Sequence, residues 1–153
     1  MRRGVRLGVD VGSVRVGVAA SDPEGLLASP IAVLQRDPKR GTDLIELARL
    51  AAEREAVEIV VGLPRSLSGG EGKAAKSARE YASSLAQRVA PVSVRLVDER
   101  LSTVEATRGL QQAGVRAREG RRVIDAAAAV VILQHALDTE RSASGSPGEE
   151  TSS

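Results

Sequence analysis

Four acidic residues occupy positions where a carboxylate is costly unless it is used. Asp10 ends an apolar run, Asp98 and Glu99 end another, and Asp125 opens the apolar stretch 126–133. An ionised carboxylate at the edge of a core must be paired, hydrogen-bonded or bound to a metal. Carboxylates that converge without a histidine or cysteine partner suit Mg²⁺ or Mn²⁺, which take oxygen ligands and leave positions for water and phosphate. Two such ions about 4 Å apart can activate a water and stabilise the leaving oxygen of a phosphodiester.

Each acid also has a structural explanation when it is taken alone. Asp10 could be a turn residue, Asp125 a capping charge, and the Asp98–Glu99 pair one half of an ion pair with Arg100. Their joint placement at one edge of a sheet favours the metal site. Strand alternation sends Asp98 and Glu99 to opposite faces, so only one of them can join the cluster. The spacing does not say which.

Five strands and four helices must position these acids. The strands are expected at 5–12, 14–21, 26–34, 57–63 and 92–97, and the helices at 42–55, 74–89, 102–113 and 123–137. Thr42 is the expected N-cap of the first helix. This order predicts an α/β fold with a mixed five-stranded sheet, three antiparallel strands and then two parallel ones, flanked by helices. The ends of the first, fourth and fifth strands then meet at one edge.

The last predicted helix directs Asp125 toward that sheet. Ala128, Ala129 and Ile132 follow Asp125 at spacings of three, four and seven residues, which places all four on one helix face. Because Asp125 falls in the first turn of a helix that starts at Val123, the helix dipole also favours its charge.

The composition fits one compact domain. The chain has 153 residues, 42% of them apolar, which suits a core within residues 1–138, while 139–153 are rich in Ser, Gly and Glu and are expected to form a disordered tail. No apolar run approaches membrane-spanning length, so we expect a cytoplasmic protein without a membrane partner. The absence of cysteine excludes disulfides and thiolate chemistry, and the single histidine, His135, cannot form a zinc site alone.

Charge and aromatic content bear on a nucleic-acid partner. The net charge is +2, but residues 1–137 hold 21 basic and 16 acidic groups, a net charge of +5. Tyr81 is the only aromatic residue, so the chain lacks stacking platforms and would recognise nucleic acid through its backbone and shape. The candidate phosphate-binding residues lie beside the acids or flank the glycine-rich loop 66–72, and they are Arg65, Lys73, Arg100, Arg116, Arg118, Arg121 and Arg122. A solvated basic loop is the competing interpretation for residues 114–120.

Four blocks of the sequence, in order, resemble the YqgF/RuvX family. They are Asp10-Val11-Gly12-Ser13-Val14-Arg15-Val16-Gly17, Val61-Gly62-Leu63-Pro64 with Gly69, Asp98-Glu99-Arg100-Leu101-Ser102-Thr103, and Asp125-Ala126-Ala127-Ala128-Ala129. The resemblance covers residues 4–138 and implies a ribonuclease H-like fold and a metal-dependent nuclease. It also implies an active site of Asp10, Glu99 and Asp125, and so chooses Glu99 over Asp98.

The resemblance leaves two nuclease functions open. One is processing of the 5′ end of precursor 16S ribosomal RNA, and the other is resolution of Holliday junctions, although the better-known resolvases of this fold use four acids rather than three. A non-catalytic nucleic-acid adaptor is a further alternative, which the presence of all three acids opposes. A sugar kinase or chaperone lobe of the actin-like type would need a second lobe, for which the chain is too short. The oligomeric state, monomer or homodimer, stays open.

Overall fold

A single mixed sheet organises the chain. The computed structural model describes residues 3–64, 72–98 and 118–144, with the backbone alone at 118–125 and 143–144. The strands are β1 (Arg6–Val11), β2 (Arg15–Ser21), β3 (Ala28–Gln35), β4 (Glu58–Leu63) and β5 (Ser93–Asp98). They lie in the order β3-β2-β1-β4-β5. β1 pairs antiparallel with β2 and parallel with β4. β2 pairs antiparallel with β3, and β4 pairs parallel with β5. The predicted α/β fold, with three antiparallel strands followed by two parallel ones, is confirmed.

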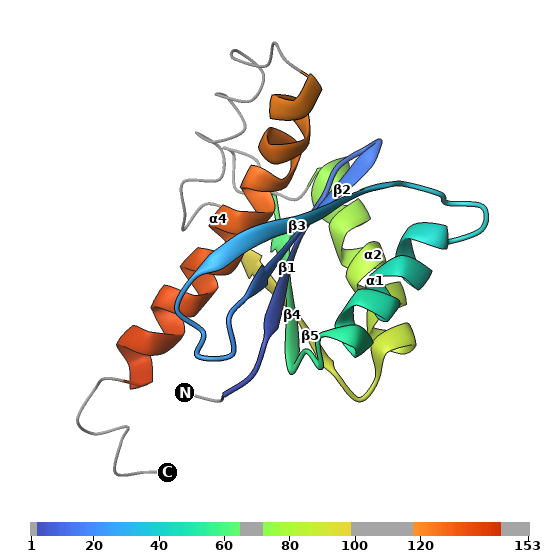
Figure 1. Ribbon diagram of the computed structural model, residues 1–153. Coiled ribbons are helices and arrows are strands. Elements are labelled where there is room, and N and C mark those ends of the chain that lie inside the picture. The colour runs from blue at the N-terminus through green and yellow to red at the C-terminus, as the bar shows by residue number, and fades with distance from the viewer. Residues whose placement is uncertain (1–2, 65–71, 99–117, 145–153) are drawn as a thin grey trace.

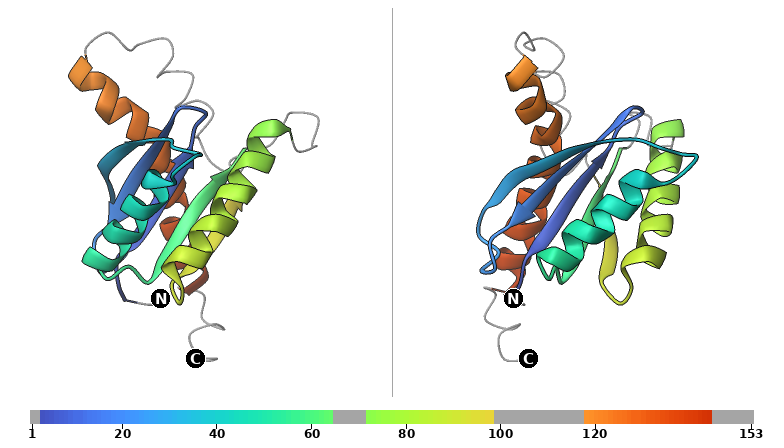
Figure 2. Two further views of the ribbon diagram at one scale, coloured as in Figure 1. Left: turned by 90° about the vertical axis from the view of Figure 1, so that its right-hand side faces the viewer. Right: turned by 45° about the vertical axis from the view of Figure 1, so that its right-hand side comes forward.

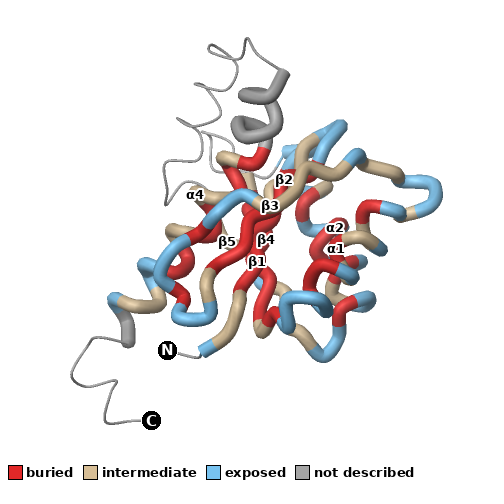
Figure 3. The backbone as a smooth tube through the Cα atoms, in the orientation of Figure 1, coloured by how far each residue is buried: buried red, intermediate tan, exposed pale blue. Residues whose placement is uncertain are grey.

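Helices cover both faces of this sheet (Figures 1 and 2). α1 (Thr42–Glu53) and α2 (Lys73–Val89) pack on one face, and α4 (Arg118–Ser144) crosses the other. In α1, Leu47, Leu50 and Ala51 recur at helical spacing and are buried. The buried backbone in Figure 3 follows the central strands, where both faces are covered.

Alternation along β1 sends its side chains to these two faces. Leu7 and Val9 are fully buried in the cluster under α1 and α2. Gly8, between them, lies against α4, where an added Cβ would come within 2.6 Å of Leu133 Cβ and 2.8 Å of the Ala129 carbonyl oxygen. Only glycine allows this approach. Gly8 therefore sets the distance between α4 and the strand that carries Asp10.

The last helix is longer than the sequence pattern predicts. It starts at Arg118 rather than Val123, because the helix-forming tendency of Arg and Glu offsets the roughly 1 kcal/mol cost of Gly120 in its interior. It also continues past Leu137 to Ser144, so the tail expected from residue 139 begins too early. Tertiary contacts hold these extra turns: Arg141 Nη1 donates to the Gly25 carbonyl at 2.8 Å, and Glu140 pairs with Arg6 at 3.1 Å.

Two further expectations concern helices. Thr42 is not the N-cap of α1; Gly41 is, in the left-handed conformation, and the Thr42 hydroxyl instead donates to Asp37 Oδ2 at 2.9 Å. The helix expected at 102–113 lies outside the described residues. Within the described ranges, no helix combines the length and apolar character that crossing a membrane requires.

Candidate active site

Asp10 stands near the carboxyl end of β1, on the face of the sheet that α4 covers. Its neighbours Val9 and Val11 pack toward α1 and α2, so alternation turns Asp10 to the opposite side, as it does Gly8. The Asp10 side chain is half-buried, and the backbone of Asp10 lies opposite Gly17 in the antiparallel ladder between β1 and β2. The described ladder between β1 and β4 ends one residue earlier, at Val9 and Val61. Asp10 is thus held near the carboxyl end of the central strand, just beyond its described pairing with β4.

Asp98 lies on the other face of the sheet. It pairs with Leu63 of β4, which packs against α2. The preceding residue, Val97, packs against the cluster under α4. Because neighbours along a strand alternate, Asp98 and Asp10 are on opposite faces. The sequence pattern left open whether Asp98 or Glu99 joins Asp10. The sheet separates Asp98 from Asp10.

Position 125 of α4 lies toward the carboxyl end of β1. The helix runs opposite to β1: Glu140 contacts Arg6, and Ala129 and Leu133 lie against Gly8. Asp10 is two residues beyond Gly8, roughly 6.6 Å along the strand. Position 125 is about one helical turn, or roughly 6 Å, before Ala129.

A buried stripe of α4 follows this position. Ala128, Ala129 and Ile132 are at most 1% exposed and pack against the sheet. Position 125 precedes them by three, four and seven residues, as predicted. One part of that prediction is wrong: because α4 begins at Arg118, position 125 lies about two turns inside the helix. The dipole of the helix N-terminus, which acts within the first turn, does not reach it.

The remaining predicted residues are placed only in part. Lys73 opens α2 and is exposed, with Lys76 exposed one turn later. Arg118, Arg121 and Arg122 are helical in α4, so of the connection expected at 114–120, residues 118–120 belong to the helix instead. Four predicted site residues lie outside the described residues: Arg65, Glu99, Arg100 and Arg116.

The described part of the candidate site offers carboxylate oxygens as ligands for a cation. Among the residues whose side chains are described, no three His, Cys, Asp or Glu residues form a group that could hold a metal. Of the predicted triad, only Asp10 belongs to that set. Its half-buried carboxylate, near the carboxyl end of a strand, has the oxygen ligands that a hard cation such as Mg²⁺ takes.

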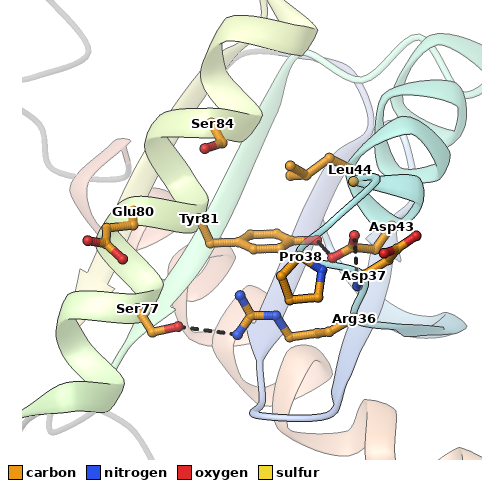
Figure 4. A pocket seen from close by; sticks show the side chains of 10 residues that line it. Arg36, Asp37, Pro38, Asp43, Leu44, Ser77, Glu80, Tyr81 and Ser84 are labelled. Atoms are coloured by element: carbon orange, nitrogen blue, oxygen red, sulfur yellow. Dashed lines mark hydrogen bonds between the residues drawn. The ribbon is translucent and has the colours of Figure 1, made fainter.

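A polar network that the sequence pattern missed lies behind the hairpin after Asp10 (Figure 4). It lines a cavity of about 210 Å³ between α1 and α2. Tyr81 donates to the buried Asp43 at 2.9 Å, and the Arg36 guanidinium lies over the Tyr81 ring at 5.3 Å. Burial, together with the Asp43 carboxylate, raises the pKa of Tyr81 above its ordinary value, so Tyr81 remains a donor. The one available signal was the isolation of Tyr81 as the sole aromatic residue.

Sequence comparisons agree with this architecture over nearly the whole chain. A protein of Frankia casuarinae named "Putative pre-16S rRNA nuclease" is 57% identical over 144 residues, covering 94% of this chain and 71% of its own length. A protein of the same name from Streptomyces coelicolor is 54% identical over 151 residues, covering 97% of this chain and 89% of its own length.

The fold and the family follow from two further comparisons. Thermus thermophilus RuvC, in a structure with a Holliday junction substrate, matches with a TM-score of 0.56 at 15% identity, covering 91% of this chain and 96% of that one. This likeness shows a shared ribonuclease H-like fold. The family described as "RuvX: Holliday junction resolvase" matches residues 4–139. Given that match and relatives above 50% identity, the chain belongs to the RuvX family.

Proposed function

We propose that the chain is a metal-dependent nuclease whose site is formed by Asp10, Glu99 and Asp125. The observation that supports this proposal is that α4 runs opposite to β1 and packs Ala128, Ala129 and Ile132 on the face of the sheet where Asp10 lies, with position 125 three, four and seven residues before them. In this proposal, two acids far apart in the sequence share one face of the sheet, next to a buried core. Such a pair is unfavourable unless a cation neutralises it.

Alternation supports Glu99 as the third member. Asp98 lies on the α2 face, level with Leu63, so it cannot join Asp10 without a distortion of β5. Of the two adjacent acids, Glu99 is the one that strand alternation leaves for the α4 face.

The three carboxylates would hold Mg²⁺ or Mn²⁺ as oxygen ligands. When bound, such ions lower the pKa of water and stabilise the charge on the leaving oxygen of a phosphodiester. The role of Asp10 is to present its oxygens from a rigid, centrally placed strand. The role of α4 is to hold position 125 against that strand, at the close contact that Gly8 permits. The exposed Lys73 and Lys76 at the start of α2 supply positive charge for a phosphate backbone.

The substrate we propose is structured RNA, namely the 5′ region of precursor 16S ribosomal RNA. The names of the relatives from Frankia and Streptomyces support this substrate. The single aromatic residue fits recognition through backbone and shape, because base stacking needs aromatic platforms. The description of the family favours a second candidate, a four-way DNA junction. Symmetric cutting of a junction would require two sites and hence a dimer.

The test compares the two substrates under matched conditions. The full chain is incubated with Mg²⁺ or Mn²⁺ and either precursor 16S RNA bearing its 5′ extension or a synthetic four-way junction. Asp10→Asn and Asp125→Asn should each lower the rate at least about 100-fold, because each removes a proposed metal ligand. The preferred substrate decides between the two nuclease functions.

Two adjacent acids provide a matched control. Glu99→Gln should abolish cleavage, whereas Asp98→Asn, on the other face, should retain most of it. Equal losses in both variants would contradict the assignment of faces. If neither substrate is cut while both bind in a salt-dependent way, the chain is a nucleic-acid adaptor and the nuclease proposal fails.

A further inference from the structure

Arg36 ties the hairpin that follows Asp10 to the body of the protein. Its Nη1 donates to the Gly12 carbonyl at 3.1 Å and to Ser77 Oγ of α2 at 3.2 Å. Its backbone N–H donates to the Val14 carbonyl at 2.8 Å. One residue thus contacts both limbs of the turn between β1 and β2, only two residues from Asp10.

The guanidinium of Arg36 is itself held in place (Figure 4). It lies over the ring of Tyr81, 5.3 Å from the centroid, a distance at which a cation and an aromatic face attract. Tyr81 is 5% exposed and donates to Asp43, which is also 5% exposed and accepts the Asp37 N–H at 3.3 Å. The Arg36 contact with Gly12 therefore rests on buried partners from both α1 and α2.

The turn of the hairpin between β1 and β2 is exposed to solvent. Ser13, Val14 and Arg15 are exposed, with Val14 at 58%. The turn closes through the Gly12 N–H, which donates to the Arg15 carbonyl at 2.9 Å. The described pairing of β1 with β4 stops at Val9, so beyond it only β2 is seen to pair with the strand. The carboxylate of Asp10 would follow any movement of this turn.

We propose that Arg36 is a positioning residue for Asp10: it fixes the Gly12–Arg15 turn against α2 so that the Asp10 carboxylate is held where metal and phosphate meet it. This inference rests on the proposed nuclease function. Arg36 acts through the backbone of the turn.

The test uses Arg36→Met, which keeps an apolar stem and removes both side-chain hydrogen bonds. Arg40→Met is the matched control, because Arg40 is an exposed arginine of the loop that follows Arg36. In steady-state cleavage, Arg36→Met should lower kcat about tenfold with KM nearly unchanged, since an interaction that acts only on the reacting geometry is lost. Arg36→Lys, which keeps the charge but not the fork, should recover part of the loss. Arg40→Met should match the wild type.

Two readouts do not need catalysis. Binding of Mn²⁺ alone, measured by calorimetry, should weaken about three- to tenfold in Arg36→Met and remain unchanged in Arg40→Met. Hydrogen–deuterium exchange of the segment 11–16 should become faster in Arg36→Met alone. Should that variant not fold, Ser77→Ala removes one acceptor of Arg36 and should shift each readout in the same direction by a smaller amount.

The outcomes separate this proposal from the nuclease assignment. Unchanged kcat, Mn²⁺ affinity and exchange in folded Arg36→Met would overturn the positioning role. A raised KM with unchanged kcat would also overturn it, because Arg36 would then be a contact for the substrate. If the wild type cuts neither substrate, the proposed function fails, while Mn²⁺ affinity and exchange still decide whether Arg36 positions Asp10.

Discussion

Replacing Gly8 by alanine tests the close contact between α4 and β1. The added Cβ would meet Leu133 Cβ at 2.6 Å and the Ala129 carbonyl oxygen at 2.8 Å. Neither atom is the end of a flexible side chain, so no rotamer change relieves the clash. Carbon atoms prefer separations of about 3.5–4 Å, so α4 must move by roughly 1 Å.

The cost follows from what α4 buries. Its stripe of Ala128, Ala129, Ile132 and Leu133 is at most 1% exposed. Forcing a methyl into such a contact costs about 1–3 kcal/mol, and the clash with backbone places Gly8→Ala toward the upper end, about 2–3 kcal/mol. For a domain of this size we expect Tm to fall by roughly 5–10 °C.

Chemical denaturation of both variants measures this effect. Gly72→Ala is the control, because a Cβ at Gly72 meets nothing within 4 Å and its φ of −93° suits any residue. Because Gly72 is the N-cap of α2, where glycine is preferred to alanine, the free energy of unfolding of this control should fall by no more than about 1 kcal/mol. A Gly8→Ala protein as stable as the wild type would refute the close packing of α4 on β1, and with it the support for placing position 125 near Asp10.

Three further perturbations test other contacts. Tyr81→Phe removes a donor to the buried Asp43 and should lower the free energy of unfolding by about 1–3 kcal/mol in urea titration; no change would mean that water replaces the hydroxyl. The backbone N–H of Arg40 and the Thr42 hydroxyl lower the pKa of Asp37, so Asp37 contributes stability above its unfolded pKa and loses it in more acidic solution. Asp37→Asn should therefore be less stable than the wild type at pH 7, with the difference vanishing as the pH falls well below about 4; a constant difference would exclude this cause. Glu140→Gln removes the charge beside Arg6, which is 1% exposed, and should cost about 1–3 kcal/mol in thermal or urea unfolding; an unchanged value would mean that the last turns of α4 contribute nothing.

The sequence predicted the sheet well because its signals are local. Each strand is a short apolar or alternating run bounded by turn residues, and the order of elements leaves few topologies. All five strands are found within two residues of their predicted bounds. The apolar stripe of the last helix was also predictable, because Ala128, Ala129 and Ile132 recur at helical spacing and pack on the sheet; the facing of Asp125 stays a prediction.

What the pattern could not predict depends on contacts between distant segments. The last turns of α4 look like a polar tail, and they are helical where Arg6 and Gly25, more than 100 residues away, provide partners. Arg36 follows a strand and has no sequence motif around it. Its hydrogen bonds to Gly12 and Ser77 join segments that are distant in the sequence, so they could not be predicted from it. Long-range polar contacts of this kind leave no periodicity in a sequence.

The described contacts that hold α4 lie toward its C-terminal end, so a small tilt of the helix about that end displaces position 125. The contacts of α4 with Arg6, Gly8, Gly25 and Ala28 all lie on the C-terminal side of position 125. Position 125 is about 22 Å from Glu140 along the axis, so a tilt of about 3° about that end moves it by roughly 1 Å. A displacement of about 1 Å can change a rate by about 100-fold. In the nuclease site that we propose, substitutions at the far end of α4 should therefore alter the rate of cleavage through the tilt of the helix.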